Sequence, residues 1–537
     1  MRRSKNVQDV DRARSAPSGV LSRSVVPVPE LPLTVPPLGD LPPEDLRRCA
    51  RRAADWAADY LATLEDRPVL PAVEPGDVRA LVAGSAPEVG EPLDRVLDDL
   101  DRVVTPALTH WQHPGFLAYF NASASAPGVV GELLTAALNV NAMLWKTSPA
   151  ATELEQAVLG WLRQMIALPD PFWGVFYDGG SASTFHALAA AREAALGPAF
   201  RRCGLVDPGG NGPVRLRLYA TAHTHSSVQK AAIALGLGLD AVREVATDGE
   251  HRMDPGALAE RVARDRAAGD RPFCVVATIG TTSTTSVDPV DRIADVAERE
   301  GLWLHVDAAH GGPLAVLPEK RVLFEGWDRA DSITTNPHKW LFVPLDCSAL
   351  FTRHPGVLRR AFSHVADYLV TERTGLADEG AVEDYMDYGV PLGRRFRALK
   401  VWLVLRTFGR SGIEARLREH VRLAGAFASW VDADPRFERV APVPMSTVCF
   451  RARPGAASGD GDDWDGDDWD EADRFNIGLM DAVNATGEVY LSHTRLDGRV
   501  VLRLSVSGLR TEERHVRRAW ELLKAMASLQ SGASPPP

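Results

Sequence analysis

The 537-residue sequence contains no apolar stretch long enough to span a bilayer, which argues against an integral membrane protein. Its basic first residues, 1–19, lack the apolar core of a secretory signal peptide. Positive charge is also in deficit, because the formal net charge is -11 at pH 7. A chain this acidic is not expected to have nucleic acid or an anionic membrane as its main partner.

Cysteine is scarce and scattered. The five cysteines show no CxxC spacing, which argues against both a disulfide framework and a structural zinc site. No metal site is expected. Reduced thiols fit a cytoplasmic protein, and this is the location that we expect.

Proline is dense at the beginning of the chain. Residues 1–45 are rich in proline, serine and arginine, and such a density of proline opposes both helix and paired strand. We therefore expect a disordered leader. From Leu46 to Leu64, apolar residues recur at helical spacing and predict an amphipathic helix. A helix of this length must pack on something larger, and a second subunit is one such surface.

The middle of the chain alternates short apolar, β-branched runs with helix-like stretches. The runs are WGVFY, VRLRLYAT, PFCVVATIG, LWLHVDAA and ADSITT. Helical patterns such as TFHALAAAREAAL and VDRIADVAERE separate them. This order is typical of βα units, and it predicts an α/β fold with a mainly parallel sheet that binds ligands at the carboxyl ends of its strands.

The last part of the chain changes to a helix followed by separated strands, which predicts a smaller α+β domain. Within it, residues 458–473 form an acidic near-repeat of DDWDG. Carboxylates bind calcium, but this stretch lacks the ligand order and terminal Glu of an EF-hand. We interpret it as a solvated insertion loop.

Asp307 and Lys339 each follow a predicted strand, so both can face one ligand at the edge of a sheet. A lysine that forms a Schiff base and an aspartate that pairs with a pyridinium nitrogen are what pyridoxal phosphate requires. The pair alone is weak evidence, because an aspartate capping a turn and a surface lysine would give the same pattern.

Two strand–helix junctions add groups that suit a flat, phosphorylated ligand. The stretch GGSASTFHAL combines small residues with a helix amino terminus, which favours phosphate, although an ordinary capped helix fits it equally well. His225 in HTHSSVQKAA can stack on a ring or simply cap a helix. His223 and His225 have no third ligand at a recognisable metal spacing.

Together these stretches resemble the pyridoxal-phosphate-dependent group II decarboxylases, most closely the aromatic L-amino acid decarboxylase family. The resemblance covers residues 46–525, and its most specific motifs are NPHKW and HVDAA. The other matching stretches follow the family's order and include LTHWQHPGFLAYF, SPAATELEQAVLGWL, GGSAS, HTHSSVQKA, VATIGTT, DCSALF, PLGRRFRALKVWLVLRTFG and TGEVYLSHTRLDGRVVLRLSV.

The resemblance implies the fold of pyridoxal-phosphate-dependent transferases, which is aspartate-aminotransferase-like and called fold type I. Such a chain has a large, mainly parallel-sheet domain, a smaller C-terminal α+β domain and an N-terminal helical arm that crosses between the subunits of a homodimer. The implied divisions are a leader at 1–45, a helical dimerisation segment at 46–124, a large cofactor-binding domain at 125–399, a small domain at 400–525 and a disordered tail at 526–537.

The resemblance also implies a cofactor, pyridoxal 5'-phosphate, and the residues that hold it. Lys339 would carry the Schiff base, with Asp307 at the ring nitrogen and His225 stacked on the ring. The remaining contacts would be Ala309 beneath the ring, Thr282 near the cofactor and the substrate carboxylate, and His338 with the segment Ala182 and Ser183 at the phosphate.

The implied reaction is decarboxylation of an L-amino acid to its amine and carbon dioxide. Lys339, His225 and Asp307 would act at the reacting centre. Tyr368, in a Gly- and Thr-containing stretch typical of a surface lid, would return a proton to the carbanion. Oxidative formation of an aldehyde, which some relatives perform, is an alternative.

The substrate is expected to be an aromatic amino acid. By resemblance, Trp111 and Phe120 would line its pocket, whereas simple core packing is the preferred interpretation of Tyr119. Asn121 and Ala122 stand where animal enzymes have a Pro-Thr pair, so a hydroxyl that could recognise a substrate phenol is missing. Asn141 and Met143 fall where the family has larger apolar residues that reach in from the partner subunit.

A more polar pocket would admit a glutamate- or aspartate-like substrate. Arg503 would then pair with its carboxylate, although an arginine at a strand edge is the simpler interpretation.

Overall fold

The computed structural model describes residues 39–364, 382–454 and 468–530, apart from residues 83, 208, 210 and 211. Two compact units make up the chain. One contains residues 39–56 and 75–106, and the other contains residues 57–74 and 107 onward. Tyr368, the expected leader up to residue 38 and residues 458–467 of the expected insertion lie outside the described residues.

The smaller unit is helical. The amphipathic helix expected from Leu46 is observed as α1 (Pro43–Ala62), which runs on into the larger unit. The other helices are α2 (Asp77–Val82) and α3 (Leu93–Asp99). Arg52 on α1 reaches the Asp94 carboxylate at 3.2 Å and donates to its backbone carbonyl at 2.8 Å, so polar contacts hold α1 beside α3.

The larger unit contains a seven-stranded sheet with the order β1-β7-β6-β5-β4-β2-β3. All neighbouring pairs are parallel except those of β7, which runs antiparallel to β1 and β6. The predicted mainly parallel sheet is therefore confirmed. The strands are β1 (Trp173–Tyr177), β2 (Leu216–Ala220), β3 (Val242–Glu244), β4 (Arg271–Thr278), β5 (Trp303–Asp307), β6 (Ser332–Thr335) and β7 (Ser348–Thr352).

Helices cover both faces of this sheet, which is why its strands are apolar on both sides. Along β4, Phe273 and Val276 pack against one set of helices, whereas Val275 and Ala277 pack against the other. The first set is α6 (Gly180–Leu196), α8 (Ser227–Ala234) and α12 (Pro355–Phe362). The second set is α5 (Pro149–Met165), α9 (Pro255–Ala267), α10 (Val290–Glu300) and α13 (Arg397–Ala433). The remaining helices near this sheet are α4 (Ala126–Leu138), α7 (Phe200–Cys203) and α11 (Pro337–Trp340).

Local signals set several helix ends. The Asp254 carboxylate caps α9 by accepting the N–H of Gly256 at 2.7 Å, and the Ser148 hydroxyl accepts the N–H of Ala151 at the start of α5. Gly301 ends α10 in the left-handed region, with φ of 61°.

A four-stranded antiparallel sheet with the order β10-β11-β9-β8 forms the C-terminal part. Its strands are β8 (Phe437–Arg439), β9 (Thr447–Ala452), β10 (Ser492–Leu496) and β11 (Arg499–Ser505). The helices beside it are α14 (Asp468–Asn484) and α15 (Glu513–Gln530). Residues of α13, β9, β11, α14 and α15 share one apolar core. The smaller α+β region expected after the large sheet is thus present.

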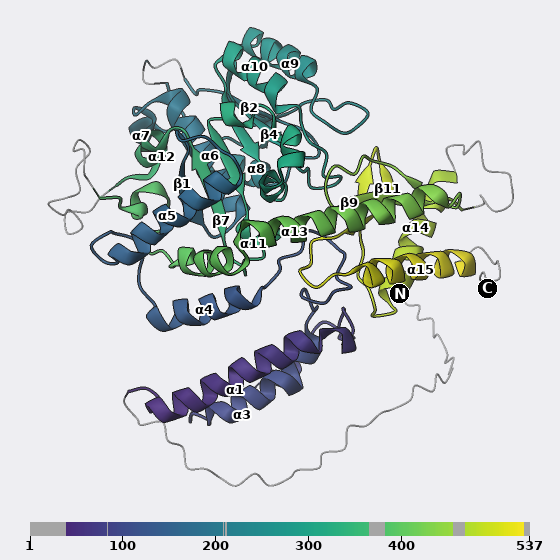
Figure 1. The fold of residues 1–537 in the computed structure, drawn as a ribbon. Coiled ribbons are helices and arrows are strands. Elements are labelled where there is room, and N and C mark those ends of the chain that lie inside the picture. Colours follow the sequence, from purple (N-terminus) through teal and green to yellow (C-terminus); the bar gives the residue numbers. More distant parts are fainter. Residues whose placement is uncertain are drawn as a thin grey trace, which may run out of the picture. The chain divides into compact units, whose positions relative to one another are not determined.

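The long helix α13 joins the two sheet regions (Figure 1). Its backbone breaks at Gly409, which has φ of 62°, so it consists of two helical pieces. The expected domain boundary at residue 399 falls inside its first piece. Likewise α14 begins at Asp468, so the last part of the expected acidic loop is helical.

Candidate active site

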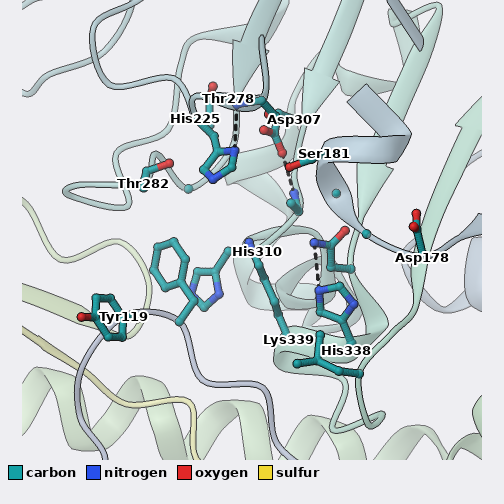
Figure 2. A pocket seen from close by; sticks show the side chains of 18 of the residues that line it. Tyr119, Asp178, Ser181, His225, Thr278, Thr282, Asp307, His310, His338 and Lys339 are labelled. Carbon is teal, nitrogen blue, oxygen red and sulfur yellow. Dashed lines mark hydrogen bonds between the residues drawn. The ribbon is translucent and has the colours of Figure 1, made fainter. Parts of the chain in front are cut away.

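A cavity of about 420 Å³ opens where β1, β4, β5 and β6 end, and this volume suits a small ligand. Figure 2 shows Lys339 in it, with Tyr119 and His310 on one side and His338 and Asp178 on the other. The sequence predicts ligands at this edge of the sheet, because the carboxyl ends of the parallel strands meet here.

Asp307 and Lys339 both line the cavity. Asp307 is the last residue of β5 and is buried, and its carboxylate accepts the N–H of Ala309 at 3.0 Å. Lys339 lies in α11, the single turn after β6. The structure therefore brings together the carboxylate and the amine that the sequence singles out.

The charge of Lys339 is disfavoured by its surroundings. Burial lowers the pKa of its ammonium from the ordinary value, while Asp307 opposes that effect. A lowered pKa increases the fraction of neutral amine, which is the nucleophilic form. Lys339 is therefore suited to attack a carbonyl carbon.

His225, Thr282 and Ala309 also line the cavity. The Nδ1 atom of His225 accepts the N–H of Ser227 at 3.1 Å, which leaves the ring proton of the neutral form on Nε2. Burial lowers the pKa of His225, so the neutral form is favoured. The backbone N–H of Thr282 donates to the carbonyl of His223 at 3.4 Å, which fixes its loop beside the imidazole.

The end of the cavity near the start of α6 has the features of a phosphate-binding site. Its lining includes Gly179, Gly180 and Ser181, where β1 turns into α6, and the N–H groups at the start of a helix attract anions. A Cβ at Gly180 would lie 2.8 Å from the Asn336 side chain, so glycine allows this loop to approach Asn336. The cavity also includes His338, whose Nδ1 accepts the N–H of Cys347 at 2.9 Å.

Ala182 and Ser183, expected at the phosphate, lie in the first turn of α6 but do not line the cavity. The Ser183 hydroxyl is buried and hydrogen-bonds the hydroxyl of Ser348 at 2.7 Å. Ser348 in turn donates to Asn336 at 2.7 Å, so Ser183 supports the cavity wall from behind.

Phe120 lines the cavity, as expected for a residue beside an aromatic substrate. Its ring centroid lies 5.4 Å from Nζ of Lys339. Tyr119, expected in the core, is instead 45% exposed and also lines the cavity. Its backbone is left-handed, with φ of 52°, and its hydroxyl hydrogen-bonds that of Tyr490 at 2.9 Å.

The other expected substrate residues do not line the cavity of their own chain. Trp111 stacks on Phe116 with a centroid separation of 4.5 Å and is 39% exposed. Asn121 is buried, and its amide donates to the backbone carbonyl of Trp111 at 2.8 Å. The side chain of Asn141 contacts Met143, with 3.3 Å between Nδ2 and Sδ.

Arg503 is not a solvent-facing arginine at a strand edge, as the simpler interpretation of the sequence has it. It is only 5% exposed, on the inner strand β11, and it lines the cavity. Its Nε donates to the carbonyl of Ser283 at 2.8 Å, whereas Nη2 has no hydrogen-bond partner among the described residues. Burial lowers the pKa of the guanidinium, so an anion would be well placed beside it.

Several lining residues escape sequence reasoning, among them Thr278, Asn336 and His310. Thr278 ends β4, and the position of a polar residue at a strand end is the signal that could have identified it. Asn336 begins the NPHKW motif. His310 lies three residues after Asp307, a spacing that signals nothing by itself.

A family model described as the pyridoxal-dependent decarboxylase conserved domain matches residues 75–453, which is more than half of the chain. The chain belongs to the pyridoxal-dependent decarboxylase family. Its cofactor is pyridoxal phosphate, and the protein is an amino acid decarboxylase.

Relatives of this decarboxylase align over nearly their full length. A phenylacetaldehyde synthase of Arabidopsis thaliana is 38% identical over 90% of this chain and 96% of its own. The tryptophan decarboxylase 1 of Oryza sativa subsp. japonica is 39% identical over 90% of this chain and 93% of its own. Among solved structures, an Oryza sativa TDC with PLP and tryptamine is 38% identical, with a TM-score of 0.86, over 92% of this chain and 100% of that one.

The side chains of the decarboxylase fit its cofactor. Lys339 has an amine whose lowered pKa suits covalent attachment, and the carboxylate of Asp307 in the same cavity would suit the ring nitrogen. The start of α6 provides N–H groups for the phosphate. When bound, pyridoxal phosphate supplies a ring that takes up the electron pair left by the departing carboxylate.

Within the ranges that the structure covers, no three His, Cys, Asp or Glu side chains gather as a metal site would require. Nor does any helix in those ranges have the length and apolarity to cross a membrane.

Proposed function

We propose that this decarboxylase acts on an aromatic L-amino acid and releases its amine and carbon dioxide. The observation that carries the proposal is the half-buried ring of Phe120 at 5.4 Å from the Lys339 amine. An aromatic side chain attached near Lys339 would find a flat apolar partner there. The similarity to tryptophan decarboxylases supports the same class of substrate.

The proposed roles at the reacting centre follow from the groups in the cavity. Lys339 would hold the cofactor covalently until the substrate amine replaces it. Asp307 would keep a proton on the ring nitrogen, because a carboxylate stabilises a positive charge beside it. His225 would stack on one face of the ring, and the small side chain of Ala309 would leave room on the other.

The proposed phosphate contacts are the N–H groups at the start of α6, including that of Ala182, together with His338. Ser183 would support them through Ser348. Thr282, which lines the cavity, would lie near the substrate carboxylate. We also propose that Tyr368 returns a proton to the substrate α-carbon after carbon dioxide leaves.

The test is carbon dioxide release by the purified holoenzyme with each of the twenty amino acids and with dopa. We expect release from aromatic amino acids and at least tenfold less from the others. Faster release from glutamate or aspartate would contradict the aromatic assignment.

A second candidate substrate is an acidic amino acid. The observation that favours it is the Nη2 atom of Arg503, which is buried without a hydrogen-bond partner in the described part of the chain. An arginine pairs strongly with any carboxylate, including the α-carboxylate that every amino acid carries. Arg503→Met separates the two cases, since loss of activity on aromatic and acidic substrates alike would assign Arg503 to the α-carboxylate.

Aldehyde formation is a further candidate, because a phenylacetaldehyde synthase is among the relatives at 38% identity. It would consume oxygen and water and release the aldehyde, carbon dioxide, ammonia and hydrogen peroxide in place of the amine. Chromatography of the products from the same reactions distinguishes the two, and we expect the amine to predominate.

We further propose that the decarboxylase is a cytoplasmic homodimer. Half-exposed apolar side chains on α4 support a dimer, since such patches mark interaction surfaces. Asn141 and Met143, which do not line the cavity of their own chain, would reach the cavity of the partner. All five cysteines fall in the described ranges as free thiols, which fits a reducing compartment.

A further inference from the structure

His310 occupies an unusual position in the cavity. It is only 1% exposed, and its ring lies parallel to two aromatic rings. The centroid of Phe120 lies 3.8 Å away at an interplanar angle of 9°, and that of Trp340 lies 4.8 Å away at 6°. Because two rings stack on the imidazole and the side chain is almost fully buried, a substrate group could reach only its edge, and only if a neighbouring side chain shifts. Figure 2 shows this ring beside Lys339.

Neither ring nitrogen of His310 has a hydrogen-bond partner among the residues that the structure describes. Other buried histidines are satisfied at least once: Nδ1 of His338 accepts the N–H of Cys347, and Nδ1 of His420 accepts Nε1–H of Trp340. A buried polar group without a partner is costly. The nitrogens of His310 would therefore gain from a hydrogen bond to a bound ligand.

His310 is a neutral ring. Burial lowers its pKa well below the ordinary value, and the nearby charges of Lys339 and Arg503 lower it further. A neutral imidazole offers one N–H donor and one nitrogen acceptor. It therefore matches a neutral hydrogen-bonding group, whereas an anion would pair more strongly with the guanidinium of Arg503 in the same cavity.

The cavity has two distinguishable ends, and His310 lies at the substrate end. The start of α6, Asn336 and His338 form the phosphate end. Tyr119 and His310 lie at the other end, and Lys339 lies between (Figure 2). Phe120 belongs to this end because it stacks on His310, and Arg503 belongs to it because its guanidinium lies 5.3 Å from the Phe120 ring. A substrate side chain must point away from the phosphate, so it would lie against Phe120 and near the edge of His310.

We propose that His310 selects substrates by hydrogen-bonding a hydroxyl group on the aromatic side chain. The inference rests on the proposed aromatic decarboxylation and narrows its substrate class to hydroxylated aromatic amino acids. A hydroxyl both donates and accepts, so it can satisfy whichever nitrogen of His310 faces the ligand. A site that hydrogen-bonds a substrate hydroxyl disfavours the analogue that lacks it, since its own polar group is then left unpaired.

The test compares L-tyrosine with L-phenylalanine, and 5-hydroxy-L-tryptophan with L-tryptophan, in the holoenzyme and in His310→Phe. In the pair that turns over faster, we expect kcat/KM of the wild type to favour the hydroxylated member by about tenfold or more. His310→Phe keeps a flat ring in the stack but removes both nitrogens. It should lower kcat/KM about tenfold for the hydroxylated member and change that of the other less than about threefold.

Binding of product amines gives a readout that does not depend on turnover. Titration calorimetry with tyramine and phenethylamine should give a Kd ratio that favours tyramine in the wild type and approaches one in His310→Phe. The exposed His493→Phe on β10 is the matched control, and it should leave both ratios unchanged.

The outcomes separate the two proposals. Equal use of both members of a pair by the wild type would overturn the role of His310, even if His310→Phe failed to fold. An equal loss on both members in His310→Phe would also overturn it, because the imidazole would then serve the reacting centre. Absence of turnover on every aromatic amino acid would instead reject the proposed function, and with it this inference.

Discussion

Trp340 and His420 are joined by a 2.8 Å hydrogen bond from the indole Nε1 to the imidazole Nδ1, and their rings are parallel to within 1°. Trp340 directly follows Lys339 in α11, whereas His420 lies on α13. Both side chains are buried. The bond thus ties the turn that carries Lys339 to the long helix that joins the two sheet regions.

Trp340→Phe should test this link. The substitution removes the N–H donor and leaves Nδ1 of His420 buried without a partner, at a cost of about 1–3 kcal/mol in the free energy of unfolding. We expect a lower midpoint of thermal unfolding together with a lower kcat, since α11 positions Lys339. Trp161→Phe is the control, because Trp161 is 40% exposed on α5. Equal behaviour of the two variants would show that the hydrogen bond contributes nothing.

Lys339→Ala should abolish both activity and covalent attachment of the cofactor. The holoenzyme reduced with borohydride should carry a pyridoxyl group on the peptide that contains Lys339, and mass spectrometry would detect it. Lys320→Ala is a suitable control, because Lys320 donates to the carbonyl of Pro444 and lies outside the cavity. A label that persists on Lys339→Ala would assign the attachment to another lysine.

Much of the cavity could be predicted from sequence because it depends on a few short-range rules. Asp307 and Lys339 meet because their strands are parallel neighbours, β5 and β6, and the carboxyl ends of such strands share one edge. The NPHKW and HVDAA motifs then identified the chemistry. The antiparallel β7 was not expected, because an apolar run indicates a strand without giving its direction.

The substrate end of the cavity was harder to predict, since it depends on side-chain direction in loops. Tyr119, with its left-handed backbone, lines the cavity, whereas Asn121 points into the protein and bonds Trp111. Arg503 comes from a different sheet, so its approach depends on the packing of two regions far apart in sequence. His310 has no local signal, because its role arises from two rings that pack on it.

Leu133→Asp should dissociate the proposed homodimer. The exposed apolar side chains of α4 are Val130, Leu133, Leu134 and Leu138, each between 43% and 56% exposed. A charge placed among them would be costly to bury in an interface. We expect sedimentation to show a dimer for the wild type and a monomer for the variant, with reduced activity if a partner completes the site.

Leu529→Asp is the control for the effect of Leu133→Asp on the dimer. Leu529 is a similarly exposed apolar residue, at 60%, but it belongs to α15 and not to α4. This variant should remain dimeric. A monomeric wild type with full activity would contradict the proposed homodimer.

Tyr368→Phe should change the product rather than the cofactor. If the phenol returns the proton to the α-carbon, its loss should slow amine release by about 100-fold or more, the usual contribution of a positioned proton donor. Aldehyde should then form a larger share of the product, as quantified by chromatography. An unchanged rate and product would assign the proton transfer to a different group.

Acid should destabilise the decarboxylase, and the pKa values of its buried histidines set the pH range in which stability falls. The pKa of His186, His305 and His420 is lowered from 6.5 to about 4, and that of His338 to about 3, mainly by burial. Between pH 6.5 and 4 the unfolded chain therefore binds protons that the folded chain does not, so stability falls as pH falls. Asp288 acts in the opposite direction, because burial raises its pKa from 3.8 to about 6.

The histidines with a lowered pKa, which also include His113 at about 4, outnumber Asp288 and Asp384, whose pKa burial raises, so the midpoint of thermal unfolding should fall steadily from pH 6.5 to 4. Each histidine contributes a slope of up to about 1.4 kcal/mol per pH unit. His305→Gln should reduce the dependence of stability on pH by the contribution of one histidine. His493→Gln, at an exposed position, should leave that dependence unchanged. A profile that is flat in the wild type would mean that the fold does not hinder protonation of the buried imidazoles, which would contradict this prediction.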